Sequence, residues 1–214
     1  MIHIFQYMEY NFDRLIQLTI EHLFMALAAV LIGILTGIPL GVLIARKRWL
    51  TGTVLWIANA FQTIPVLALV GFLMIFLGLG KGTAITALYF YTLLPIIQST
   101  YTGLNAIEPS IIEAAKGMGM SQNQIFWKIE IPMSLSILFV GIRIAAVVSI
   151  GTTTIMSLVG AGGLGYEIFT GINRMNNQMV IIGALLAALL AYVVQKLIQW
   201  FEVRFTSKGL KIIK

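Results

Sequence analysis

Cysteine is absent from this chain of 214 residues, and charged side chains are scarce. Without cysteine, disulfides, thiol catalysis and zinc-thiolate sites are excluded. Charged residues make up 10% of the chain and hydrophobic residues 59%, and the mean hydropathy is +0.94. This composition leaves too little polar surface to cover a soluble globule of this size, so the surrounding solvent is largely lipid.

Catalytic and nucleotide-binding motifs are also missing. Asp13 is the only aspartate, and both histidines lie at or before the start of the first hydrophobic run. The sequence contains no H-E-x-x-H, G-x-S-x-G or G-x-x-x-x-G-K-[ST], so nothing predicts an enzyme, a metal site or an ATPase site. An ion-coupled secondary carrier usually needs a titratable carboxylate or histidine within the membrane, and this alternative is therefore less favoured.

Five hydrophobic regions are long enough to cross a bilayer core, which takes about 20 apolar residues per helix. They are His22–Ala45, Val54–Gly80, the stretch between Lys81 and Glu108, the stretch from Ile131 to Glu167, and Met175–Gln195. The predicted fold is all-α, a polytopic membrane protein with five transmembrane helices and short cytoplasmic coupling helices. We divide it into an extracellular or interfacial N-terminal segment (1–19), a transmembrane domain (20–205) and a basic cytoplasmic tail (206–214).

Basic residues predict the orientation, because they concentrate in cytoplasmic loops. One side of the predicted topology has only Arg14, Lys81 and Arg174. The other side collects Arg46, Lys47, Arg48, Lys116, Lys128, Arg204, Lys208, Lys211 and Lys214. The N-terminus is therefore expected outside and the C-terminus inside. This distribution accounts for the net charge of +6 without any nucleic-acid partner.

The first 19 residues do not form a secretory signal. They contain Glu9 and Asp13 and lack a basic start, which a signal peptide requires. We expect a short extracellular helix that lies on the membrane.

Residues 106–131 are a charge-bearing segment between the third and fourth hydrophobic regions. Pro109 follows a glutamate and suits the first turn of a helix, and Gly119 suits the turn after its end. Ser121 and Gln124 have the spacing of a capping box, which starts a second helix. The sequence predicts two short helices joined by a tight glycine turn, lying across the cytoplasmic face of the membrane.

This segment reads Glu113-Ala114-Ala115-x-x-x-Gly119 and, ten residues later, Ile129-x-Ile131-Pro132. The pattern resembles the cytoplasmic coupling loop of permease subunits in ATP-binding-cassette importers, with Ile131 in place of the usual leucine. The resemblance implies an ATPase-coupling set of Glu113, Ala114, Ala115, Gly119 and Pro132. It also implies that ATP and magnesium are bound by a separate ATPase, so that this chain needs no cofactor.

Other stretches resemble permeases that import glycine betaine, carnitine, choline and related osmoprotectants, a family with a methionine-importer-like fold. They are Gln62-Thr63-Ile64-Pro65, Ile150–Thr154 and Gly160–Gly165. The resemblance covers nearly the whole chain and implies import of a quaternary-ammonium osmoprotectant. The residues expected along the translocation path are Gln62, Thr63, Pro65, Thr152, Thr153, Gly162 and Gly163. The alternatives are an ATP-binding-cassette permease for another small solute, such as an amino acid, or an ion-coupled carrier.

The resemblance also implies an assembly in the inner membrane of a bacterial cell. The expected partners are two ATPase subunits, a second permease subunit that is either identical or a paralogue, and an extracellular or lipid-anchored substrate-binding protein.

Arg143 is the only charge well inside a predicted span, where an unpaired charge is expensive. We expect a structural role for it, with backbone carbonyls or a dimer seam as partner, in preference to contact with a cationic substrate. Gly160-x-Gly162-x-x-Gly165 also spells a dinucleotide fingerprint, but no strand precedes it and no acidic residue follows at the required spacing. These glycines are expected either to line the path or to pack tightly against a neighbour.

Glycines and prolines add two expectations about the spans. Gly33, Gly37 and Gly41 form a small-residue stripe that allows a second helix to approach closely. Pro65 and Pro95 each remove a backbone hydrogen bond and are expected to curve or kink their helices.

Overall fold

The computed structural model describes residues 2–206, and every regular element in this part of the chain is a helix. The α-helices are α1 (Ile2–Tyr10), α2 (Phe12–Arg46), α3 (Thr51–Thr63), α4 (Val66–Leu77), α5 (Lys81–Asn105), α6 (Pro109–Gly117), α7 (Gln122–Ile125), α8 (Ile131–Met156), α9 (Leu164–Asn173) and α10 (Asn177–Phe205). Two 3-10 turns, η1 (Arg48–Leu50) and η3 (Ser157–Val159), and one π turn, η2 (Phe126–Glu130), connect them. The all-α prediction is confirmed.

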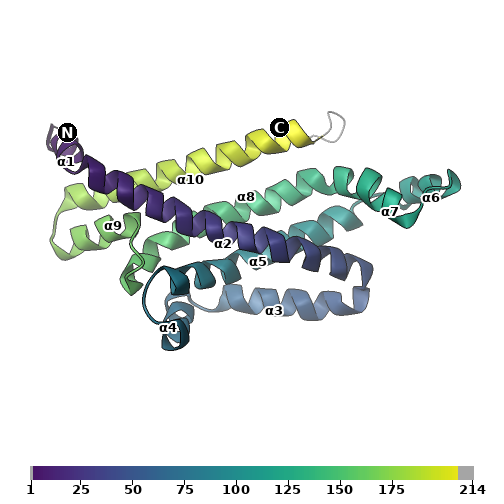
Figure 1. Cartoon of the computed structure of the whole chain (residues 1–214), viewed down its shortest axis with the longest axis horizontal. Coiled ribbons are helices and arrows are strands. Elements are labelled where there is room, and N and C mark those ends of the chain that lie inside the picture. The colour runs from purple at the N-terminus through teal and green to yellow at the C-terminus, as the bar shows by residue number, and fades with distance from the viewer. Residues whose placement is uncertain (1, 207–214) are drawn as a thin grey trace.

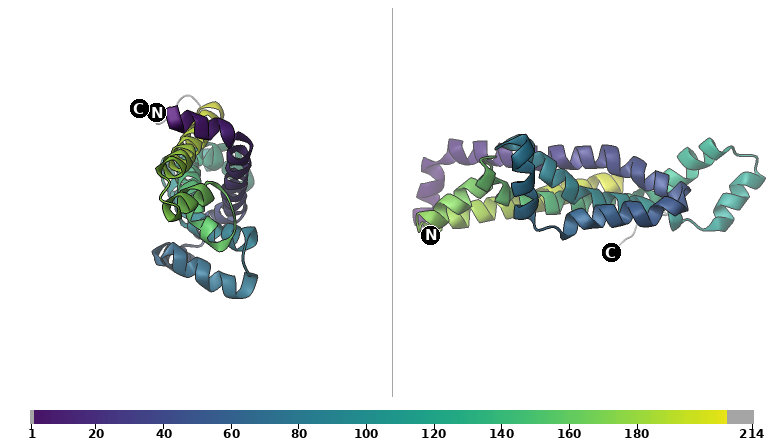
Figure 2. Two further views of the ribbon diagram at one scale, coloured as in Figure 1. Left: turned by 90° about the vertical axis from the view of Figure 1, so that its left-hand side faces the viewer. Right: turned by 90° about the horizontal axis from the view of Figure 1, so that it is seen from below.

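The long helices run along the long axis of an elongated bundle (Figure 1). Helix α5 packs against both α2 and α8, and α10 packs against α8 and α9. Helices α3 and α4 contact α5 on the side away from α10; α3 runs along the bundle, and α4 lies across it (Figure 2). The α6–α7 hairpin projects beyond one end of the bundle, while α1 and α9 lie at the other end (Figure 1).

Three helical stretches of the described chain are long and apolar enough to cross a membrane: α2, the continuous stretch Gln122–Val159 that contains α8, and α10. The bent pair α3 and α4 makes a fourth if it counts as one span. Helix α5 has 25 residues but does not meet the same criterion. The protein is therefore membrane-embedded, with three or four apolar spans by length and composition.

The second hydrophobic region is broken instead of forming one straight span. Helices α3 and α4 meet at an angle of 98°. Pro65 has no N–H and forces the residue before it out of the helical region, so Ile64 is extended with ψ 127°. The Tyr91 hydroxyl donates to the carbonyl of Ile64, which the break leaves free. Pro95, in contrast, lies inside a continuous α5.

The predicted glycine stripe on α2 packs directly against α5. A Cβ atom at Gly33 would lie 3.1 Å from Ile96 Cδ1, and one at Gly37 would lie 2.9 Å from Ile96 Cγ2. At Gly41 it would lie 2.7 Å from Thr100 Cγ2. Close helix contact therefore depends on these three glycines, as the sequence predicts.

Three basic residues lie toward one end of the bundle. Arg46, Lys116 and Arg204 lie in the last turns of α2, α6 and α10, which run toward the end that carries the α6–α7 hairpin (Figure 1). Most of the predicted N-terminal segment forms α1 and the start of α2, whose first residue, Phe12, precedes His22. Apart from Thr206, the predicted basic tail lies outside the described residues.

Candidate functional site

The segment between α5 and α8 has the predicted helix–turn–helix form. Helix α6 starts at Pro109 and ends at Gly117, and Gly119 has φ +80°, which favours glycine. The Ser121 side chain accepts from the backbone N–H of Gln124, and the Gln124 side chain accepts from the N–H of Ser121 at 2.8 Å. The predicted capping box is confirmed.

Helix α7 is not a separate element, because the π turn η2 joins it directly to α8. Pro132 lacks an N–H, and its ring crowds the carbonyl four residues earlier. The helix widens ahead of this proline, and the N–H of Ile131 bonds to Phe126, five residues back. The hairpin therefore continues into α8 with no loop between them.

The predicted coupling residues divide into an outward-facing and an inward-facing group. Glu113, Ala114 and Gly119 are exposed at the tip of the molecule. Ala115 is buried, as is Ile125 of α7, against which α6 packs. Pro132 is half-buried at the start of α8. The structure thus places three of the five on an accessible surface and uses Ala115 to close the hairpin.

An ion pair ties this segment to α2. The buried carboxylate of Glu130, in η2, pairs with the guanidinium of Arg46 at the end of α2. The same guanidinium lies 5.5 Å from the centre of the Phe126 ring. Sequence reasoning missed the pair because the two residues are 84 positions apart. The one feature of the sequence that indicated a buried charge was the position of Glu130 between two isoleucines at the start of a span.

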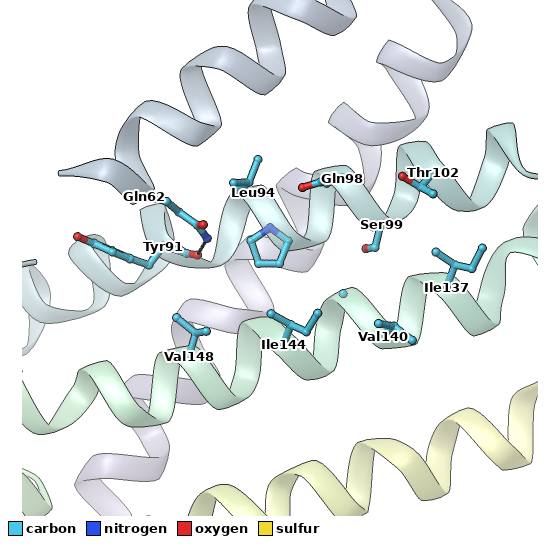
Figure 3. A pocket seen from close by; sticks show the side chains of 12 residues that line it. Gln62, Tyr91, Leu94, Gln98, Ser99, Thr102, Ile137, Val140, Ile144 and Val148 are labelled. Atoms are coloured by element: carbon cyan, nitrogen blue, oxygen red, sulfur yellow. Dashed lines mark hydrogen bonds between the residues drawn. The ribbon is translucent and has the colours of Figure 1, made fainter. Parts of the chain in front are cut away.

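A cavity of about 490 Å³ opens between α5, α8 and the end of α3. Its polar lining comes from Gln62, Tyr91, Gln98, Ser99 and Thr102 (Figure 3). Apolar side chains of α8, such as Ile144, face them from the other wall. None of the lining residues, all of them within the described chain, is charged.

Of the residues predicted for the translocation path, Gln62 reaches this cavity, where its side chain donates to the Tyr91 carbonyl at 2.8 Å. Thr63 and Pro65 are exposed at the α3–α4 bend. Thr152 is half-buried in α8, and Thr153 is buried, donating to Ser149. Three other polar residues of α5 that line the cavity, Gln98, Ser99 and Thr102, were missed, although Gln98 and Thr102 are one helical turn apart.

Gly162 and Gly163 pack against α2 instead of lining the cavity. Gly163 donates its N–H to Glu21 at 3.3 Å, and the next N–H, of Leu164, reaches Nδ1 of His22 at 3.3 Å. His22 Nε2 lies 2.9 Å from the carbonyl of Ile150, which it can reach only as a donor. Of the two roles expected for these glycines, the geometry supports tight packing.

Arg143 finds its partner within the same chain. Its guanidinium lies 3.4 Å from the carboxylate of Glu202 on α10, which also accepts from Ser136 at 3.3 Å. Arg143 does not line the cavity described above.

A second buried acidic residue, Glu167 of α9, organises the opposite end of the bundle. It pairs with Arg14 at 2.5 Å and accepts from the Tyr7 hydroxyl of α1. Burial, together with the Glu167 carboxylate, raises the pKa of Tyr7 to about 12, so the phenol stays protonated and donates throughout the physiological range. The pattern of the sequence gave no indication of this cluster.

Within residues 2–206, no three His, Asp or Glu side chains gather closely enough to hold a metal ion.

Comparisons with known proteins show clear similarity over the whole chain. Residues 37–207 match the family described as binding-protein-dependent transport system inner membrane component. The chain is 37% identical to the choline transport system permease protein OpuBB of Bacillus subtilis, covering 100% of this chain and 99% of the relative. It is 43% identical to the glycine betaine/carnitine/choline transport system permease protein OpuCD of the same species, covering 92% and 86%.

Two further matches agree with these. The chain is 42% identical to the osmoprotectant import permease protein OsmW of Salmonella typhimurium, covering 96% and 98% of the two chains. Among solved structures, a chain of the inward-facing MetNI methionine ABC transporter is similar, with a TM-score of 0.80, 26% identity and coverage of 94% and 98%.

The Arg46–Glu130 pair predicts a charge-reversal experiment. Arg46→Glu and Glu130→Arg each leave a like-charge contact and should lower the melting temperature of the purified protein. The double variant restores an opposite-charge pair and should recover most of the loss, with a coupling free energy of about 1 kcal/mol because Arg46 is half-exposed. Lys47→Glu, at an exposed neighbour, is the control. Additive single-variant effects would contradict the pairing.

Proposed function

The chain belongs to the family of binding-protein-dependent transport system inner membrane components, and we propose that this importer permease carries quaternary-ammonium osmoprotectants into the cell. The observation that supports this substrate class is the 37–43% identity, over most or all of the chain, to permeases named for choline, glycine betaine and carnitine. The alternative is another small solute. The similarity to a methionine transporter favours an amino acid as that alternative solute.

The cavity between α5 and α8 suits such a substrate as part of the translocation path. A quaternary ammonium group has no N–H to donate, so it interacts through its charge with oxygen dipoles and aromatic faces. Gln62, Gln98 and Tyr91 offer both kinds of group. The nearby cation Arg143 is neutralised by Glu202 and therefore repels the substrate little. Weak, uncharged contacts let the solute leave as readily as it enters.

We further propose that the path continues beyond the cavity past Thr63, Pro65, Thr152 and Thr153. The bend at Pro65 is the moving part of this stretch. The helical hydrogen bonds between α3 and α4 are already missing at this bend, so α4 can rotate there without breaking any.

Five crossings are proposed: α2, the broken pair α3 and α4, α5, α8 and α10. Helix α5 falls short of the hydropathy criterion because it lies between α2 and α8 and gives its polar face to the cavity, so it needs little lipid-facing surface. With the basic end of the bundle inside, the N-terminus is outside a bacterial inner membrane.

The motor is proposed to be a separate ATPase that docks on the exposed face of α6. Glu113 and Ala114 form this face together with Gly119 of the turn that follows α6, and the ATPase supplies the ATP and magnesium sites. Continuity from α7 through η2 into α8, and the tie from Glu130 to Arg46, pass the motion to two long helices. Two ATPase subunits, a second permease subunit and an extracellular or lipid-anchored binding protein complete the assembly.

Uptake into proteoliposomes tests the function as a whole. With the complete transporter, ATP and binding protein present, labelled choline or glycine betaine should accumulate even after an ionophore has collapsed the membrane potential. Uptake that follows the potential and not ATP would establish a carrier instead. Accumulation of labelled methionine with neither osmolyte would establish the other solute class.

The docking face predicts different effects for two exposed carboxylates of one segment. Glu113→Lys should weaken ATPase docking and lower uptake by about tenfold, the effect of about 1.4 kcal/mol. Glu108→Lys, at the start of α6 and outside the proposed face, should change uptake less than about twofold. Co-purification of the ATPase measures docking directly. Equal losses in the two variants would contradict the assigned face.

The cavity predicts a blocking substitution. Ile144→Trp fills space beside Gln98 and should lower the maximal uptake rate several-fold while the ATPase still docks. Leu35→Trp, at a similarly apolar and exposed position of α2 that does not line the cavity, is the matched control. If both variants transport alike, the solute does not pass through this cavity.

A further inference from the structure

A second cavity, of about 470 Å³, lies at the end of the bundle that carries α1. Tyr7, Tyr10 and Arg14 line it from α1 and α2, and Arg174 and Gln178 line it from the α9–α10 connection and the first turn of α10. It is separate from the cavity between α5 and α8, with which it shares no lining residue.

The charge in this second cavity is positive. Arg14 is already paired with the buried Glu167. Arg174 makes no ion pair with any acidic residue in the described chain, so two guanidinium groups face one carboxylate. Glu9 and Asp13, on the same helices, do not line the cavity. The site is therefore suited to an anion, with the Tyr10 hydroxyl as a further donor, since the Tyr7 hydroxyl already donates to Glu167.

An apolar stripe starts directly below the cavity. Ile181, Leu185, Leu189 and Tyr192 of α10 are all exposed. They follow Gln178 at intervals of three or four residues, so they continue down the same face of the helix. From Ile181 to Tyr192 the helix rises about 16 Å at about 1.5 Å per residue, close to half of the bilayer core of about 30 Å.

We propose that this cavity and stripe bind one anionic phospholipid. The phosphate lies between Arg14 and Arg174, the Tyr10 hydroxyl donates to one of its oxygens, and an acyl chain follows the α10 stripe through one leaflet. The stripe gives a lipid an advantage over a free anion, and the excess positive charge favours an anionic headgroup over a zwitterionic one. The inference requires α10 to lie in the membrane and does not depend on which solute is transported.

Native mass spectrometry of the full-length permease, titrated with lipid in detergent, tests this site. Phosphatidylglycerol should bind more tightly than phosphatidylcholine. Removing one cation near the phosphate by Arg174→Gln should weaken phosphatidylglycerol binding about fivefold. Gln178→Glu keeps the side-chain shape, adds a negative charge at the lip and should weaken binding as well. Arg48→Gln, an exposed cation near the other end of α2, should leave binding unchanged.

Competition distinguishes a lipid from a free anion. Glycerophosphoglycerol, which has the headgroup without acyl chains, and inorganic phosphate should not displace the lipid at equal concentration. Displacement by either would overturn the proposal, because the stripe would then contribute nothing. Equal binding of the two lipids, or equal effects of the Arg174 and Arg48 variants, would overturn it too. Lipid binding is measured without ATPase or solute, so its failure leaves the transport assignment untouched.

Discussion

In lipid, every backbone N–H and C=O must find a partner within the protein, and this constraint explains the irregular features of the fold. Where Pro65 breaks a span, the Tyr91 hydroxyl takes the freed carbonyl of Ile64. Where the chain turns after η3, Glu21 and His22 accept from the N–H groups of Gly163 and Leu164. At both places, polar side chains within the bundle bond backbone groups that have no helical partner.

The cost of leaving a charge unpaired away from water explains why three carboxylates that enter the described bundle each meet an arginine. Glu167 meets Arg14, Glu130 meets Arg46, and Glu202 meets Arg143. Each pair joins two different helices, so each one also fixes how those helices lie against one another. Helix α5, at the centre, has an ion pair only at its first residue, where Lys81 lies 2.9 Å from Glu21 of α2, and its cavity face carries uncharged polar groups. Ion pairs thus connect the helices, and uncharged polar side chains line the cavity between them.

Local features were predictable from the sequence because their causes are local. The turn at Gly119, the capping box at Ser121 and the glycine stripe of α2 each follow from residues within a few turns of one another. Partners far apart in sequence were not predictable. From the sequence alone, Glu130 is an ordinary loop glutamate, whereas the structure pairs it with Arg46. Gly163 was expected along the path, whereas the structure packs it against His22. The 98° break at Pro65 was expected only as a kink, since a proline does not determine its angle.

The unbroken stretch Gln122–Val159 is 38 residues of helix, about 57 Å at about 1.5 Å per residue. A rod of that length acts as a lever: a tilt of about 5° about one end moves the far end by about 5 Å, the height of one helical turn. Its far end is η3, which leads into the glycine turn held by His22. A modest push at one membrane surface is thus enough to displace structure at the opposite surface, with no unfolding in between.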